Sequence, residues 1–227
     1  MATPDGPLAD VRDMAGIHTM FRREFGLMPA LVRTSSGTDA DRRTLVADHV
    51  ALLTGFLEHH HAGEDIHIWP LLRERCSEID APFVELVENQ HRTVHGGLES
   101  VGKSLVDWRR TGSKDAAESL ANAVEQLLPP LREHLALEEE KVVPLISAHV
   151  TDAEYSRVAQ EQGADVPPEK LPVLFGMFMY ETDSEVVDVV VSHMPPEVQP
   201  VIKDLATGAY AAYAEQLYGT ATPSLGA

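Results

Sequence analysis

Two segments of this 227-residue chain repeat the same spacing of histidine, glutamate and proline. They are HHAGEDIHIWPLL, which begins at His60, and HLALEEEKVVPLI, which begins at His134. The histidines, the glutamates four residues later and the prolines ten residues later are each offset by 74 positions. A further histidine precedes each segment, and these two, His18 and His91, are 73 positions apart. The chain is therefore a duplicated unit organised around residues that bind metals.

Apolar residues at steps of three and four predict amphipathic helices through both halves. Start and stop signals place these helices at Asp10 to about Leu31, Asp39 to near Pro70, Asp80 to Trp108, and Ser113 toward His134. Short connections join them, and only 6% of residues are aromatic, which argues against an all-β fold. The pattern predicts an all-α protein built on an antiparallel four-helix bundle.

The sequence changes character after His149. Thr151 to Glu154 form a capping-box pattern, a Gly/Pro loop runs from Gly163 to Pro168, and residues 171–219 read as two or three further helices. The segment LPVLFGMFMY is apolar on nearly every side, which predicts that it is buried. We expect a bundle over residues 1–150 and a C-terminal helical extension over residues 151–227 that packs on it.

Charge and cysteine content restrict the partners. Acidic residues outnumber Lys and Arg by 36 to 18, which disfavours binding to nucleic acid or to an anionic membrane surface. A single cysteine cannot form an internal disulfide, and neither a secretory signal nor a membrane-spanning stretch is visible. We expect a cytoplasmic protein that is a monomer or a weak homo-oligomer.

The repeated spacing predicts a metal site. Residues four apart on a helix share one face, so each histidine can converge on a metal with its paired glutamate. A single such pair is commonly a surface pair, but six ligand-type residues in two matched halves favour a site inside the bundle. Imidazole and carboxylate suit iron, with manganese or zinc as alternatives, and two carboxylates suit a pair of ions. The expected ligands are His18, His60, Glu64, His91, His134 and Glu138.

This order of His, HxxxE, His and HxxxE, with a proline six residues after each glutamate, resembles the HHE cation-binding, hemerythrin-like family. The resemblance covers about residues 8–150, and the C-terminal helices resemble the extension of some actinobacterial members. It implies a non-haem di-iron centre held by the same six residues, with an oxo or hydroxo group and both carboxylates bridging two iron ions.

Other histidines near the repeat are candidates for a secondary role. His95 follows His91 by four residues, so it is an alternative fifth ligand. His59 and His61 project about 100° to either side of His60, so we expect them to support the ligands or to face solvent.

Three further side chains adjoin the expected site. Tyr180 would bring a phenol near the metals if its helix packs across the bundle, and it is otherwise a core tyrosine. Asp65 and Glu139 follow the two glutamates and are expected on a solvated acidic face. No catalytic residue beyond the ligands is expected.

The resemblance implies a small oxidant as the ligand. Four motif histidines are fewer than the five of the oxygen carriers, which leaves coordination positions open. The leading hypothesis is a peroxide-consuming, catalase- or peroxidase-like oxidoreductase that reduces H2O2, with NO as a co-substrate, or O2. The alternative is a module that binds O2, NO or iron for storage or sensing without turnover, and a third reading is a structural helical protein. If His95 binds the metal, the alternative that binds oxygen without turnover is favoured.

Overall fold

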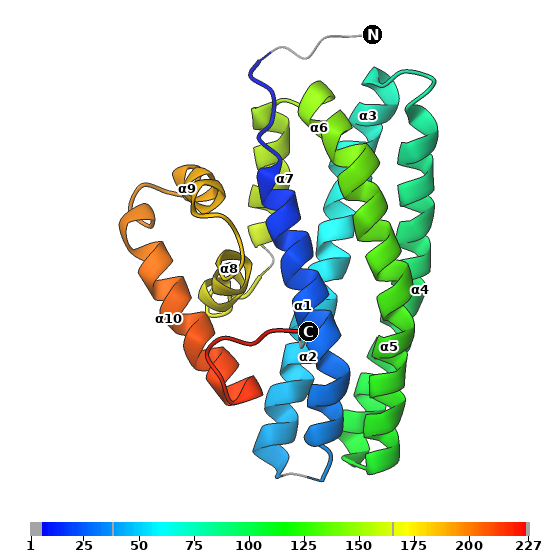
Figure 1. The fold of residues 1–227 in the computed structure, drawn as a ribbon, viewed down its shortest axis with the longest axis vertical. Helices are drawn as coiled ribbons and strands as arrows, with labels where there is room; N and C mark the ends of the chain where they lie inside the picture. Colours follow the sequence, from blue (N-terminus) through cyan, green and yellow to red (C-terminus); the bar gives the residue numbers. More distant parts are fainter. Residues whose placement is uncertain (1–5, 38, 165, 226–227) are drawn as a thin grey trace.

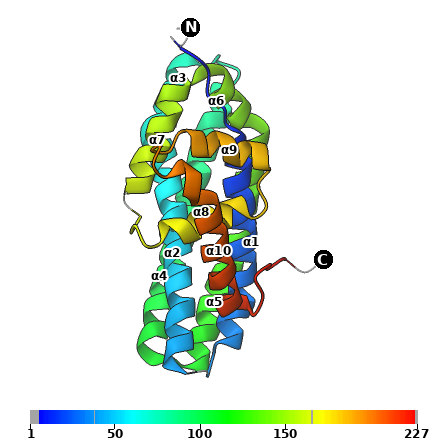
Figure 2. The same ribbon diagram turned by 90° about the vertical axis from the view of Figure 1, so that its left-hand side faces the viewer.

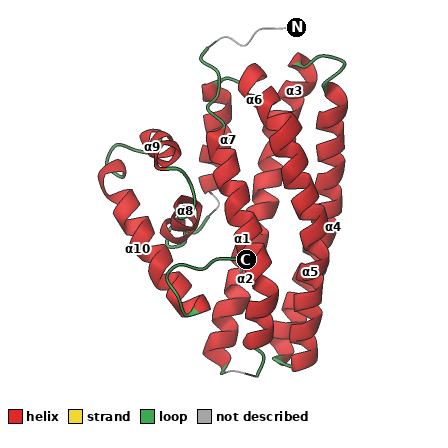
Figure 3. Cartoon of the chain, in the orientation of Figure 1, coloured by secondary structure: helices red, strands yellow, loops and turns green. Residues whose placement is uncertain are grey.

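Four long antiparallel helices form the body of the protein in the computed structural model, which describes residues 6–37, 39–164 and 166–225 (Figure 1). They are α1 (Arg12–Thr34), α2 (Ala40–Gly63), α4 (Ala81–Thr111) and α5 (Lys114–Leu137). Helix α1 packs against α2 and α5, and α4 packs against the same two helices. The described residues contain no strand (Figure 3). The predicted all-α bundle is confirmed.

Local signals begin α2 and α5 and end α4 where the sequence predicted. The Asp39 side chain accepts a hydrogen bond from the amide of Arg42 at 2.8 Å, and Ser113 accepts one from Ala116 at 3.1 Å. Gly112 ends α4 in the left-handed conformation, with φ at 61°. None of the described helices is both long enough and apolar enough to cross a membrane.

A wide helical turn follows each glutamate of the repeat. The π-helical turns η1 (Glu64–Ile68) and η2 (Glu138–Val142) lead into α3 (Trp69–Arg75) and α6 (Val143–His149). In η1 the amide of Trp69 donates to the carbonyl of Glu64, five residues earlier. Pro70 follows and has no N–H for an α-helical bond, so the chain changes its hydrogen-bond register here and again before Pro144. The expected end of the second helix near Pro70 is therefore wrong, because the helical path continues to Arg75.

The remaining helices cover one face of the bundle. They are α7 (Asp152–Ala164), α8 (Leu171–Met179), α9 (Ser184–Ser192) and α10 (Gln199–Tyr218). The capping box forms, because Thr151 and Glu154 exchange hydrogen bonds. Helix α7 continues through Ala164, so the loop predicted from Gly163 begins later. Figure 2 shows α8, α9 and α10 lying over α1 and α2.

Small residues let α8 sit close to its neighbours. A Cβ at Gly176 would lie 2.2 Å from the carbonyl oxygen of Ala206 in α10, and one at Gly16 in α1 would lie 2.4 Å from the Thr182 hydroxyl. The predicted burial of this segment is confirmed for Leu174, Gly176, Met177 and Phe178.

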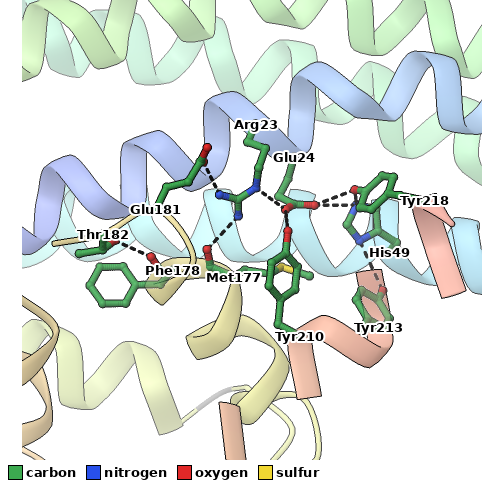
Figure 4. A network of polar contacts seen from close by, with 10 residues as sticks. All are labelled: Arg23, Glu24, His49, Met177, Phe178, Glu181, Thr182, Tyr210, Tyr213 and Tyr218. Atoms are coloured by element: carbon green, nitrogen blue, oxygen red, sulfur yellow. Dashed lines mark hydrogen bonds and ion pairs between the residues drawn. The ribbon is translucent and has the colours of Figure 1, made fainter. Parts of the chain in front are cut away.

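A buried polar network fastens this extension to the bundle (Figure 4). Arg23 donates to Glu24 at 2.9 Å, to Glu181 at 2.6 Å and to the Met177 carbonyl at 2.8 Å. The hydroxyls of two α10 tyrosines, Tyr210 and Tyr218, each donate to Glu24 at 2.7 Å. The Arg23 and Glu24 side chains are 3% and 0% exposed, so this ion pair lies in the interior.

Substituting Arg23 tests this network. Arg23→Met should lower the free energy of unfolding by about 3–5 kcal/mol, because it leaves the Glu24 carboxylate buried without its cation. Arg109→Met is the matched control, since Arg109 is 45% exposed and pairs with Asp48 at the surface, a contact worth at most about 1 kcal/mol. Urea unfolding followed by circular dichroism measures both. Equal losses in the two variants would contradict a buried role for the pair.

Candidate metal centre

The six residues expected to bind metal all lie inside the bundle, and none is more than 3% exposed. Helix α1 supplies His18, α2 supplies His60, α4 supplies His91 and α5 supplies His134. Apolar clusters lie on both sides of this polar layer along the bundle. One cluster contains Phe21, Leu57 and Leu131, and the other contains Ile68, Val87 and Val142. The polar layer is therefore enclosed by apolar packing.

Each glutamate lies next to one histidine of its own helix and one from another helix. The Glu64 carboxylate is 3.3 Å from Nε2 of His60 and 3.5 Å from Nε2 of His91. The Glu138 carboxylate is 3.4 Å from Nε2 of His134 and 3.6 Å from Nε2 of His18. The two halves of the repeat thus build matching arrangements that face each other.

The polar atoms at the centre lack hydrogen bonds to the described protein. Both carboxylate oxygens of Glu64 and of Glu138, and Nε2 of His18, His91 and His134, are buried with no hydrogen-bond partner in the described part of the chain. Such burial costs several kcal/mol per charged group unless a counter-charge is present. Imidazole nitrogens and carboxylate oxygens are donors that iron, manganese and zinc accept. The residues therefore fit a metal centre.

Burial also sets the protonation of these groups. The pKa of Glu64 is raised by its burial and then by the nearby Glu138 carboxylate. Burial, together with His91 and His18, lowers the pKa of His134 to about 2, and burial likewise lowers the pKa of His60. These imidazoles are neutral at pH 7, which is the form that binds a metal ion.

His61 lies beside the expected ligands, so of its two expected roles the structure rules out exposure to solvent. It is 5% exposed and stacks on the His91 ring at 4.1 Å between centroids. Ligand nitrogens of His61, His91 and His134 all lie within 4.8 Å of one another. The interior stripe of a bundle helix is more than 100° wide, so consecutive residues can both face inward toward different neighbours. The structure thus provides a fifth imidazole.

Asp65 and Glu139 orient two of the histidines and do not belong to a purely solvated face. Nδ1 of His91 is 2.7 Å from Asp65, and Nδ1 of His18 is 3.0 Å from Glu139. Each contact leaves Nε2 directed at the centre and fixes the ring. Burial raises the pKa of Glu139, but hydrogen bonds from His18 and Arg22 outweigh it and lower the pKa to about 2. In the sequence an acidic residue directly follows each ligand glutamate, and these two acidic residues are 74 positions apart. That repeat was the signal that could have predicted their shared role.

Three other candidates lie away from the centre. His95 is 56% exposed and contacts Glu58 and Glu99, so the structure does not bring it to the cluster as a ligand or as a support for one. His59 lines a separate cavity beside α8. Tyr180 lies at the end of α8 and packs against Arg23 and Tyr210, in the buried polar network that fastens the extension to the bundle.

A different tyrosine, Tyr155 of α7, approaches the centre. Its hydroxyl donates to Asp13 at 2.9 Å. Burial is the largest cause that raises the pKa of Tyr155. The charges of Asp13, Glu64 and Glu138 raise it further. Sequence reasoning missed Tyr155, because the predicted start of α7 does not reveal which bundle helices it packs against.

A cavity of about 500 Å³ between α2 and α4 reaches the centre from the surface. Its inner wall includes the buried His61 and His91, and its lining also includes the exposed Glu58 and His95. Ala62, Asp65, Arg92 and Leu98 complete the walls. The cavity gives small molecules access to the nitrogen-rich side of the centre.

Comparison with known proteins agrees with this geometry. The family described as the hemerythrin HHE cation binding domain matches residues 9–146, which include all six expected ligands and His61. Neither the curated proteins nor the solved structures yield a match to this chain.

The position of His61 predicts a difference between two histidine variants. His61→Ala should lower the metal affinity at least about tenfold, because it removes an imidazole from the buried cluster. His95→Ala is the control and should retain the metal content of the unmodified protein. Metal content after dialysis against a competing chelator measures both. If only the His95 variant lost metal, His95 rather than His61 would belong to the metal-binding cluster.

A second pair of variants tests the orienting acids. Glu139→Gln should weaken metal binding by about 10–100-fold, because it removes the carboxylate that holds His18. Glu140→Gln changes the next residue, which is 69% exposed and pairs with Lys141, and should leave metal binding unaltered. Titration with ferrous iron under anaerobic conditions compares the two, and equal affinities would contradict the role of Glu139.

Proposed function

Because this chain belongs to the hemerythrin HHE cation-binding domain family, we propose that it is a non-haem di-iron protein that binds and reduces small oxidants, chiefly hydrogen peroxide. The family binds metal ions, typically iron, and its domains bind small gaseous ligands such as O2. The observation that carries the proposal is the cavity that joins the surface to the buried histidines.

The donor set supports two ions rather than one. His18, His60, His91 and His134 contribute four imidazoles, His61 contributes a fifth, and Glu64 and Glu138 contribute two carboxylates that can each span two ions. Iron bound by these residues would keep room for an exogenous ligand, because they supply fewer donor atoms than two ions can accept. Bound iron would supply a couple between the ferrous and ferric states.

The protein's own residues tune and protect such a centre. Asp65 and Glu139 hold the protons of His91 and His18 at Nδ1 and leave Nε2 as the donor. The apolar clusters above and below exclude bulk water. The cavity between α2 and α4 admits small molecules. The sequence contains no flavin-binding or nucleotide-binding motif, so we propose that electrons come from the substrate or from an external donor.

One observation favours a second candidate function. With His61 the centre offers five imidazoles, the number found in the oxygen carriers. Reversible binding of O2 or NO, without turnover, is therefore the alternative that an activity assay must separate from peroxide reduction.

Blocking the cavity tests the function. In the iron-loaded protein, Ala62→Phe should slow peroxide consumption at least about tenfold while leaving the iron content unchanged, because a large ring fills the route to the centre. Oxygen release and peroxide loss measure the rate.

Ala51→Phe is the matched control, since Ala51 lies on the same helix but lines the separate cavity near α8. It should retain the full rate. Peroxide consumption no faster than that of free iron at equal concentration would contradict turnover and favour the oxygen- or nitric-oxide-binding alternative.

A further inference from the structure

A third cavity lies between the start of α1, α7 and α9. Figure 2 shows α9 crossing beside α7 and α1. The cavity measures about 600 Å³, which is within the range of small-molecule sites. Most of its wall is apolar and is formed by Leu171, Val186, Val189, Val190, Met194 and Val198. It is separate from the cavity that opens on His61.

The polar part of this wall is acidic. Asp10, Asp13 and Asp152 line the cavity, and its described lining contains neither Lys nor Arg. Asp10 pairs with Arg12, and Asp152 lies 3.7 Å from His193, so these two carboxylates already have basic neighbours.

Asp13 has no such neighbour. Its side-chain partner is the Tyr155 hydroxyl at 2.9 Å, and no basic side chain pairs with it in the described part of the chain. Burial raises the pKa of Asp13 to about 6, against the hydrogen bonds from Tyr155 and the backbone, so the carboxylate is still mainly ionised at pH 7. A carboxylate in an apolar wall is stabilised most by a cation that shares the cavity.

We propose that this cavity binds a small organic cation, whose apolar body packs on the α9 valines and whose ammonium group pairs with Asp13. The chain's net charge of −18 attracts cations toward such a site. Tyr155 lines the cavity and donates its hydrogen bond to Asp13 there. The proposal does not depend on peroxide turnover.

Calorimetric titration of the full-length protein with three six-carbon probes tests this assignment. Hexylammonium should bind at least about tenfold more tightly than hexanol, because a charge-assisted hydrogen bond contributes beyond the shared apolar contact. Hexanoate should bind more weakly than both, because its charge repels the acidic wall. Equal affinities for the amine and the alcohol, stronger binding of hexanoate, or no binding of any probe would overturn the proposal.

Two variants locate the site. Asp13→Asn should abolish the preference for hexylammonium over hexanol, whereas Asp188→Asn, on the exposed side of α9 and paired with Lys203, should preserve it. Val190→Trp should remove binding of both probes by filling the cavity, and it leaves every acidic residue in place. Unchanged binding in Val190→Trp, or an unchanged preference in Asp13→Asn, would place the ligand elsewhere and refute the assignment.

Discussion

The structure depends on the burial of two carboxylates among imidazoles, where the described residues offer no hydrogen-bond donor to satisfy them. Glu64 and Glu138 sit between apolar clusters, where an uncompensated charge costs several kcal/mol. A chain can maintain this arrangement when a stronger partner than water is supplied, and metal ions are the partners that these donors fit. The four long helices, the wide turns after each glutamate and the orienting acids all serve to hold the donors in place.

Duplication explains how a short chain builds this arrangement. Each half supplies one glutamate, and the acid that follows the glutamate orients a histidine of the other half: Asp65 holds His91, and Glu139 holds His18. Neither half completes a site alone, so the centre forms only when the helix pairs pack together. The contact with the C-terminal extension follows a different principle, because the buried ion pair between Arg23 and Glu24 of α1 is partnered by protein groups of the extension. One buried polar layer is satisfied by protein groups, and the other consists of donors that suit a metal ion.

The sequence predicted the helices and the six central residues because both depend on spacing along one helix. It named His61 as a support for the ligands or a solvent-facing residue and did not place it in the buried cluster, since an angular argument from His60 treats the inward face as narrow, whereas a bundle helix directs consecutive residues at different neighbours. It left two places open for Tyr180, near the metals or in the core, and did not name Tyr155, for a related reason. Which tyrosine approaches the centre is decided by how α7 and α8 dock, and docking is a property of packing between helices: Tyr180 meets Arg23, while Tyr155 meets Asp13.

Anomalous X-ray diffraction at the iron edge, from crystals of the iron-loaded protein, tests the central claim most directly. Two peaks should lie among α1, α2, α4 and α5, within coordinating distance of both Glu64 and Glu138. Iron bound only at exposed carboxylates, or a centre that stays empty while the six buried residues keep the same positions, would contradict it.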